Sequence, residues 1–240
     1  MWTIFIVIVL VVVGAQLFLP AYVAKRLGDG LQAATGISAW DVDVSAFPAL
    51  RLLAGDVARL AVSADHIVMQ GLHVESLQLE AENVRIGVSR LMRGGPLSVH
   101  AGGSASLRLT VTAEALTAYA RELAELPPDV RIDVGEQGVA LAGRVTLLGS
   151  PVNATVSGRF EPADHGAVAF VPDRVAVDGQ PLPPFMVAIL RELYSVRLNL
   201  TEGPLPMTVD EVIHMPGKLI VIGRPLLDGF DLVLGGPHQG

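Results

Sequence analysis

Residues 77–88 decide the fold, and they read Leu-Gln-Leu-Glu-Ala-Glu-Asn-Val-Arg-Ile-Gly-Val. Apolar and polar residues alternate as far as Glu82, and the alternation resumes at Val84 with the opposite parity. Alternation of this kind is typical of a β-strand with one buried face, and a single extra residue is typical of a β-bulge. The stretch therefore predicts a strand with a bulge at Glu82-Asn83.

The same period-two pattern recurs along most of the chain. It is found at residues 107–111, 131–135, 138–148, 152–160, 174–178, 196–200, 207–214 and 218–222. Strands with one polar face are typical of antiparallel sheets. The lengths of these segments and their closely spaced glycines predict a long, highly curved and twisted sheet.

Two amphipathic helices are predicted between the strands. Thr112 is a suitable N-cap for a helix over residues 113–126, which Pro127-Pro128 would end. A second helix is predicted to begin near Pro183-Pro184. Because the strands come in long runs, this order predicts an α+β fold and not a β-α-β alternation.

The N-terminal segment predicts a membrane anchor. Thirteen of residues 4–19 are Ile, Val, Leu or Phe, and 18 residues of helix span roughly 27 Å, close to a bilayer core. We assign residues 1–24 to one transmembrane helix; the alternative is a cleaved signal peptide ending near Val13-Gly14-Ala15. Lys25-Arg26 favour a cytoplasmic side for the following residues, although two charges do not fix the topology.

The remaining segments divide in a simple way. Residues 25–36 predict a short juxtamembrane helix near the lipid headgroups, with a stripe at Val23, Leu27, Leu31 and Ala34. Residues 37–224 form one predicted domain, and residues 225–240 a loose C-terminal tail.

Composition excludes several classes of protein. The chain is 51% apolar and 17% charged, which is incompatible with a disordered chain. It has no cysteine, which excludes disulfide scaffolds and thiolate metal sites. Its net charge of −7 argues against nucleic acid as a partner.

No catalytic or metal-binding pattern stands out. No two of the six histidines have the spacing of a helical metal site. Asp41 and Asp43 share one strand face, and they alone motivate an alternative as an envelope hydrolase or glycosyltransferase. We therefore predict no enzyme activity, no cofactor and no metal.

The aliphatic, aromatic-poor composition is compatible with an apolar cavity for a lipid chain. Each CH₂ that such a chain buries contributes about 0.8 kcal/mol. The predicted lining comes from the two helices, and an ordinary packed core is the alternative for the same residues: Leu116, Tyr119, Leu123, Phe185, Ile189 and Leu193.

Several stretches resemble the LmeA-like family of bacterial phospholipid-binding proteins. They are residues 107–119, where a strand passes into a helix through a threonine cap, residues 138–160, residues 167–183, and residues 205–223. The resemblance covers about residues 37–224. It implies a TULIP-like, BPI-like half, in which a highly curved antiparallel sheet wraps around helices.

The resemblance also implies a location on the outer side of the cytoplasmic membrane. We therefore expect a single-pass, extracytoplasmic protein that holds or shuttles phospholipid or a lipid-linked glycan precursor in the bacterial envelope. The alternative is a structural or adaptor module for envelope assembly that binds no lipid. The partners expected are phospholipid or another amphipathic lipid and the membrane, and the oligomeric state stays open.

Overall fold

The computed structural model describes residues 16, 18–32, 36–37, 40–69, 71–87, 97–124, 127–147, 150–193, 197–201, 206–226 and 231–232. The chain divides into two compact units. Unit 1 comprises Met1–Asp65, Gln78–Leu107 and Pro225–Gly240, and unit 2 comprises His66–Leu77 and Arg108–Arg224. The strands β2, β3 and β5 contribute residues to both units, and each unit is described by itself.

Unit 1 is built on a sheet with one helix. Its elements are a helix at 18–32, β1 (Trp40–Ser45), the 3₁₀ helix η1 (Ala49–Ala54), β2 (Asp56–Met69), β3 (Leu72–Ile86), β4 (Leu97–Ala101), β5 (Ala105–Thr112) and β14 (Asp231–Leu232). The strand order is β1-β2-β3, and β4 pairs with β3 and with β14. The β1–β2, β3–β4 and β4–β14 pairs are antiparallel. Asp231–Leu232 of the predicted tail are thus hydrogen-bonded to the sheet, because β4 offers them a strand edge.

The helix at 18–32 belongs to the folded unit. Val23, Leu27 and Leu31 are at most 7% exposed, which confirms three residues of the predicted stripe. Gln16 donates a hydrogen bond to the Ala46 carbonyl at 3.3 Å and accepts one from the Ala49 N–H at 2.8 Å. Gln16 and residues 18–24, which we placed in the anchor, are therefore part of unit 1, where Val23 is buried and Phe18 and Tyr22 are exposed.

The rest of the predicted anchor lies outside the described residues. Those residues are 1–15 and 17. Across the part of the chain that the structure describes, no helix combines the length and the hydropathy that a bilayer crossing requires.

The bulge predicted in β3 is confirmed. Asn83 has a φ of 52°, in the left-handed region, and its carbonyl accepts a hydrogen bond from the Gly102 N–H at 3.0 Å. Ala81 and Val84 are both buried, and two exposed residues separate them. One extra residue thus returns the apolar side chains to the same face of the strand.

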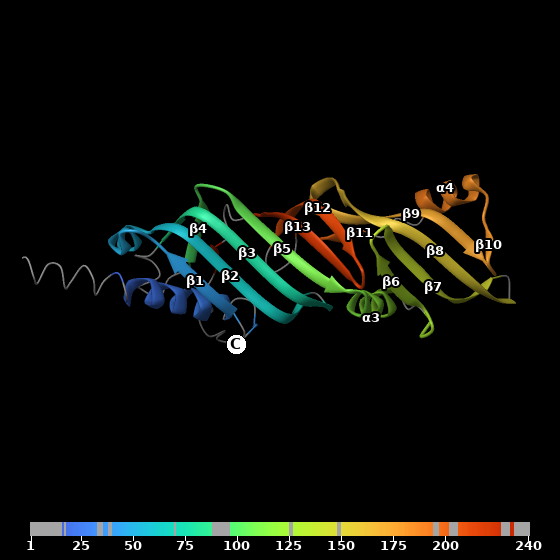
Figure 1. The fold of residues 1–240 in the computed structure, drawn as a ribbon, viewed down its shortest axis with the longest axis horizontal. Helices are drawn as coiled ribbons and strands as arrows, with labels where there is room; N and C mark the ends of the chain where they lie inside the picture. The colour runs from blue at the N-terminus through green and yellow to red at the C-terminus, as the bar shows by residue number, and fades with distance from the viewer. Residues whose placement is uncertain are drawn as a thin grey trace, which may run out of the picture. The chain divides into compact units, whose positions relative to one another are not determined.

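Unit 2 contains both of the predicted helices. It takes the last residues of β2, the first residues of β3 and the last residues of β5. Its other elements are α3 (Ala113–Ala124), β6 (Arg131–Gly135), β7 (Gly138–Leu147), β8 (Ser150–Ala163), η2 (Asp164–Gly166), β9 (Ala167–Val177), β10 (Gln180–Pro181), α4 (Pro184–Leu193), β11 (Arg197–Asn199), β12 (Met207–Met215) and β13 (Lys218–Pro225) (Figure 1). One sheet runs β2-β3-β5-β13-β12, and a second runs β10-β9-β8-β7-β6, with β11 paired to β9.

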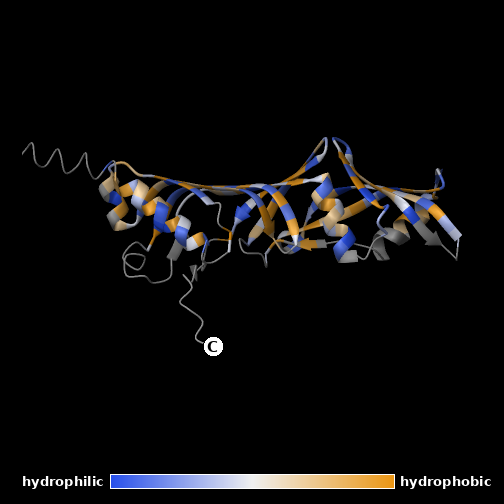
Figure 2. Cartoon of the chain, turned by 90° about the horizontal axis from the view of Figure 1, so that it is seen from below, coloured by the Kyte–Doolittle hydropathy of each residue, from blue (hydrophilic) through white to orange (hydrophobic). Residues whose placement is uncertain are grey.

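The α+β class with antiparallel strands is confirmed. The β6–β7, β7–β8, β8–β9, β9–β10 and β9–β11 pairs are all antiparallel. Hydrophobic and hydrophilic residues alternate along many of the strands in Figure 2. These features are consistent with a curved sheet, whereas the wrapping of such a sheet around helices stays a prediction.

Polar groups fix α3 at its start and against β6. The Thr112 hydroxyl accepts a hydrogen bond from the Ala115 N–H at 3.1 Å, which confirms the predicted N-cap. The Thr117 hydroxyl accepts a bond from the Ile132 N–H at 2.9 Å and donates one to the Ala113 carbonyl at 2.7 Å. Arg121 donates to the Val130 carbonyl at 2.7 and 3.0 Å. The orientation of α3 on unit 2 is therefore set by directed bonds as well as by packing.

Candidate functional site

An apolar cavity lies within unit 2, between the inner faces of its two sheets and one face of α3. Thirteen of the described residues line it, and none of these carries a charged or strongly hydrogen-bonding side chain: Met69, Leu72, Val74, Leu109, Val111, Leu116, Phe160, Val168, Leu198, Leu200, Met207, Leu219 and Val221. Period-two alternation places these side chains on the inner face of β3, β5 and β13. Only an apolar group would find compatible surroundings there.

Three residues form the rim of the cavity. Phe160, Leu198 and Leu200 are half-buried, whereas the other lining residues are at most 9% exposed. Leu198 lies opposite Val168 in the β11–β9 pair, and the Leu200 carbonyl accepts a hydrogen bond from the Met207 N–H at 3.0 Å. Among the described lining residues, these three on and next to β8 and β11 are therefore the ones that solvent reaches most.

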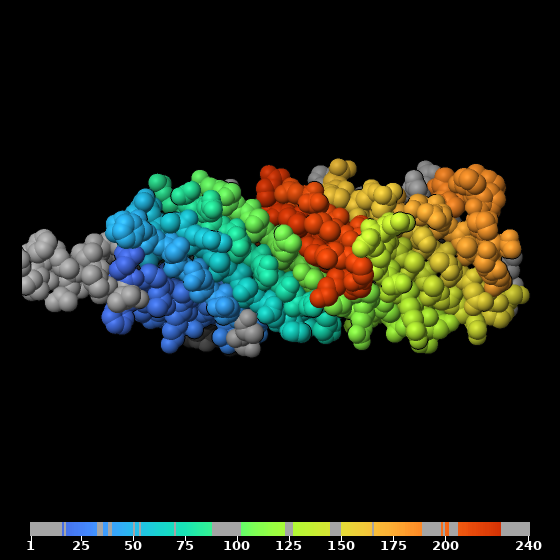
Figure 3. All heavy atoms as spheres, viewed as in Figure 1, coloured from blue at the N-terminus to red at the C-terminus, as the bar shows by residue number. Residues whose placement is uncertain are grey.

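The cavity is small in this conformation. Its volume is about 50 Å³, whereas pockets that hold drug-sized ligands measure roughly 300–1,000 Å³. In Figure 3 the outer surface over β12 and β13 is covered by closely packed atoms that meet those of β6 and β7. A long acyl chain thus requires the lining or the rim to move apart.

His214 holds the rim from β12. Its Nε2 accepts a hydrogen bond from the Phe160 N–H at 3.1 Å. Burial lowers the pKa of His214 below its usual value, and the nearby Arg159 lowers it further, while Glu161 opposes both effects. The Phe160 ring packs on the Phe170 ring, with the centroids 5.3 Å apart. Both contacts fix the position of Phe160 at the mouth of the cavity.

A family model gives the comparison that decides the class of protein. The model of the LmeA-like phospholipid-binding family matches residues 14–224. The chain belongs to this family. The match confirms the resemblance of residues 37–224 and extends it over the helix at 18–32. No curated protein and no solved structure matches the chain.

The apolar cavity is consistent with membership of a phospholipid-binding family. One of the residues predicted to line it does so: Leu116 of α3 is 8% exposed and borders the void. Tyr119 is half-buried and lies over the turn at Gly71, where a Cβ atom would come within 3.8 Å of its ring.

The other predicted lining residues are placed differently. Phe185 of α4 is 65% exposed, and its neighbour Met186 is 40% exposed, while Val187 is the buried residue of that turn. The side chains of Leu123, Ile189 and Leu193 lie outside the described residues. A lipid contact stays a prediction at all six positions, Leu116 included.

Most of the lining came from strands and was not singled out from the sequence. Eleven of the thirteen residues lie on strands β2, β3, β5, β8, β9, β11, β12 and β13, and Leu200 follows β11 directly. Alternation predicted strands at 107–111, 152–160, 196–200, 207–214 and 218–222, which carry some of these residues, but the same alternation describes every residue of an ordinary core. Only their position around one void distinguishes them.

The two carboxylates behind the hydrolase alternative are not brought together in one cleft. Asp41 and Asp43 are exposed on β1. Asp41 borders an open hollow together with Lys25 and Asp29, but Asp43 does not line it. Among the described residues no group of three His, Asp or Glu side chains is arranged to hold a metal ion.

Proposed function

We propose that this chain is a membrane-anchored, extracytoplasmic lipid-binding protein of the bacterial envelope. It holds or shuttles phospholipid or a lipid-linked glycan precursor and catalyses no covalent chemistry. The observation that carries the proposal is the apolar character of every described residue that lines the cavity in unit 2, in a member of a phospholipid-binding family.

The acyl chain is the part of the lipid that the cavity receives. A polar headgroup would lose its hydrogen bonds to water without finding a partner among the lining side chains. The chain would pass the rim between β8 and β11 and lie against Leu116 and the inner face of β5. Its headgroup would stay at the rim, in contact with water.

Native mass spectrometry of the full chain in mild detergent tests the proposal. We expect phospholipid to copurify with the protein or to be taken up from liposomes. Leu200→Asp places a charge at the rim and should abolish the lipid adduct. Met215→Asp is the control, because Met215 is an exposed apolar residue of the same unit, 46% exposed, that does not line the cavity.

Two results would contradict the proposal. One is a wild-type protein that carries no lipid and takes none up. The other is a Leu200→Asp variant that binds lipid as well as the control does, which would place the lipid somewhere other than this cavity.

A second candidate function is that of an adaptor for envelope assembly that binds no lipid. Two observations favour it: the small volume of the cavity, and the adjacent exposed side chains of Phe185 and Met186 on α4. Exposed apolar patches often mark surfaces that bind other proteins. The adaptor predicts a lipid-free mass spectrum for wild type and for both variants, so the same measurement separates the two functions.

A further inference from the structure

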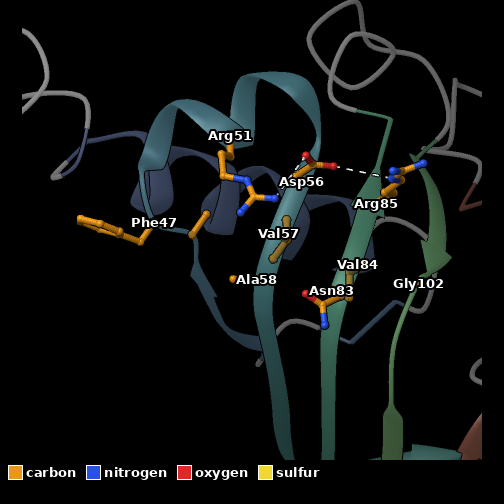
Figure 4. Close-up of a pocket in the computed structure, with 10 residues that line it drawn as sticks. Phe47, Arg51, Asp56, Val57, Ala58, Asn83, Val84, Arg85 and Gly102 are labelled. Carbon is orange, nitrogen blue, oxygen red and sulfur yellow. Dashed lines mark ion pairs between the residues drawn. The ribbon is translucent and has the colours of Figure 1, made fainter.

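Unit 1 contains a polar pocket that is separate from the apolar cavity of unit 2 and has no role in the proposed function. Its volume is about 460 Å³, and it lies between η1, the beginning of β2 and the end of β3. Figure 4 shows that Arg51 and Arg85 approach Asp56 from opposite sides, while Phe47 projects away from them. The lining also includes Asn83 and backbone at Gly102.

The backbone around this pocket is tightly joined. Gly55 ends η1 with a φ of 86°, and a Cβ atom at this position would collide with the Ile86 carbonyl. The Ile86 N–H donates a hydrogen bond to the Gly55 carbonyl at 2.8 Å. This contact holds the end of η1 against the end of β3, and thereby holds Arg51 and Asp56 opposite Arg85.

The charges in the pocket are not balanced. The Arg51 and Arg85 side chains share one carboxylate, Asp56, at 3.9 and 3.6 Å, which is longer than a hydrogen bond. Their side chains are 61% and 81% exposed, so solvent weakens both pairs. The three side chains leave one net positive charge. Two guanidinium groups with donors facing solvent suit the oxygens of a phosphate group.

One exposed aromatic side chain borders this cationic pocket, and two others lie on the helix that is joined to its loop. Phe47 is 81% exposed, although it borders the pocket. Gln16 bonds to the backbone on both sides of Phe47, at Ala46 and Ala49, which ties the helix at 18–32 to this loop. On that helix Phe18 is 76% and Tyr22 51% exposed. Their spacing of four residues puts them on one face, with the Arg26 guanidinium 5.6 Å above the Tyr22 ring.

We propose that this part of unit 1 is a membrane-docking surface, in which Phe47 enters the bilayer interface and Arg51 and Arg85 bind the phosphate of an anionic phospholipid headgroup. The surface consists of Phe47, Arg51 and Arg85. Aromatic side chains favour the headgroup region of a bilayer, and arginine is attracted to anionic lipid by about 1 kcal/mol per residue.

Charge complementarity favours a membrane over a free phosphate ester as the occupant. The chain as a whole carries a charge of −7, so an anionic bilayer repels it except where cations gather. A soluble phosphate ester would be served by the two arginines alone. It would give no reason for an aromatic ring that is 81% exposed at the edge of the same pocket.

A fluorescent label at position 47 of the full chain tests the docking surface. The chain has no cysteine, so Phe47→Cys provides a single site for an environment-sensitive dye. The labelled protein is reconstituted into phosphatidylcholine vesicles, alone or mixed with phosphatidylglycerol, with a quencher attached to the lipid tails. A label at Met215→Cys in unit 2 is the matched control, since Met215 is exposed but lies outside the surface.

We expect the label at position 47 to shift to the blue and to be quenched when phosphatidylglycerol is present, and the label at Met215 to stay in water. The double change Arg51→Gln and Arg85→Gln should lower the ratio of docked to undocked label by about thirtyfold, from about 1 kcal/mol for each of the two charges. Arg174→Gln should leave docking unchanged; Arg174 is also exposed and has a loose pair with Asp173 at 4.0 Å.

Three results would overturn the inference: a label at position 47 that stays in water on every membrane, docking that survives loss of both arginines, or binding of a soluble phosphate ester in the pocket without insertion of the label. Adding glycerol phosphate to phosphatidylcholine vesicles tests the third. The comparison of lipid uptake between wild type and Leu200→Asp tests the cavity of unit 2 and does not depend on the docking surface of unit 1. Uptake without docking therefore contradicts the inference alone, and docking without uptake contradicts only the proposed function.

Discussion

Truncation of Leu116 offers the sharpest test of the cavity, because it enlarges the void without adding a polar group. Leu116→Ala removes about three CH₂ equivalents, or roughly 2.4 kcal/mol of transfer free energy at 0.8 kcal/mol each. A term for the new hole raises buried leucine-to-alanine losses to about 2.7–5.0 kcal/mol. Leu116 already borders a void of about 50 Å³ and therefore loses fewer contacts, which places its cost near the lower end, at about 3 kcal/mol.

Lipid should offset this loss in a way that identifies the site. A ligand at about 100 times its Kd stabilises the folded protein by roughly 2.7 kcal/mol. In Leu116→Ala an acyl chain would also fill the vacated space and regain up to about 2 kcal/mol of apolar contact. The rise in Tm on adding lipid should therefore exceed that of wild type by about 4–8 °C, at 2–4 °C per kcal/mol for a chain of this size.

Leu77→Ala is the matched control for the Leu116 variant. Leu77 is also in unit 2 and is completely buried, at 0% exposure, but it does not line the cavity. We expect a loss of about 4 kcal/mol and a lipid-induced rise in Tm equal to that of wild type. Differential scanning fluorimetry with and without a short-chain phospholipid measures both quantities. Equal lipid effects in the two variants would refute the assignment of the cavity.

Two further changes test the groups that fix α3 and the rim. Thr117→Val leaves the buried Ile132 N–H without its acceptor and should lower the free energy of unfolding, measured in urea, by about 1–3 kcal/mol. Thr117→Ser keeps the hydroxyl and should lower it by only about 0.8 kcal/mol, from the lost burial of one methyl group. Equal losses in the two variants would show that the hydrogen bond contributes nothing. The pKa of His214 is lowered in the folded protein, so the unfolded state takes up a proton first as the pH falls. The free energy of unfolding should therefore be at its full value above the ordinary histidine pKa of about 6.5 and should decrease as the pH drops below it. His214→Gln keeps an acceptor for the Phe160 N–H but does not titrate, so its Tm should vary less over this pH range, and an unchanged slope would contradict the role of His214.

The fold was predictable wherever local signals were strong. The β6 strand coincides with the predicted segment 131–135, and the Thr112 cap and the Asn83 bulge were both anticipated. These features depend on residues that are close together in the sequence. They could therefore be inferred without knowing which strands pair.

The β2 strand was not predicted, and its backbone gives the reason. His66 has a left-handed φ of 55°, and two exposed residues, Asp65 and His66, separate the buried Ala64 and Ile67. A second pair of exposed residues occurs at Ala58-Arg59. Two interruptions within 14 residues break the alternation into fragments too short to recognise, although pairing with β1 and β3 holds them in one strand.

The candidate site was predictable only on its helical side. Leu116 was found because the stripe of an amphipathic helix must face the core, but α4 has the same kind of stripe and leaves Phe185 exposed. Periodicity predicts which residues share a face. Whether that face is covered depends on strands that pack from elsewhere in the chain, such as β11 and β12, and this information is not local.

The small size of the cavity bears on how long a lipid would stay bound. A sixteen-carbon chain gains on the order of 12 kcal/mol when it leaves water, but a lipid that leaves a bilayer gains almost none of this, because its tail was already in hydrocarbon. Separating Phe160, Leu198 and Leu200 from their neighbours would cost about 1.5–3 kcal/mol for each side chain that loses its burial, and a bound chain would restore that burial. On the proposed function, the closed state and a lipid-filled state would therefore be close in free energy. Such a balance suits a protein that takes up and releases lipid more than one that retains it permanently, and it makes the measured uptake depend on the lipid concentration at the membrane surface.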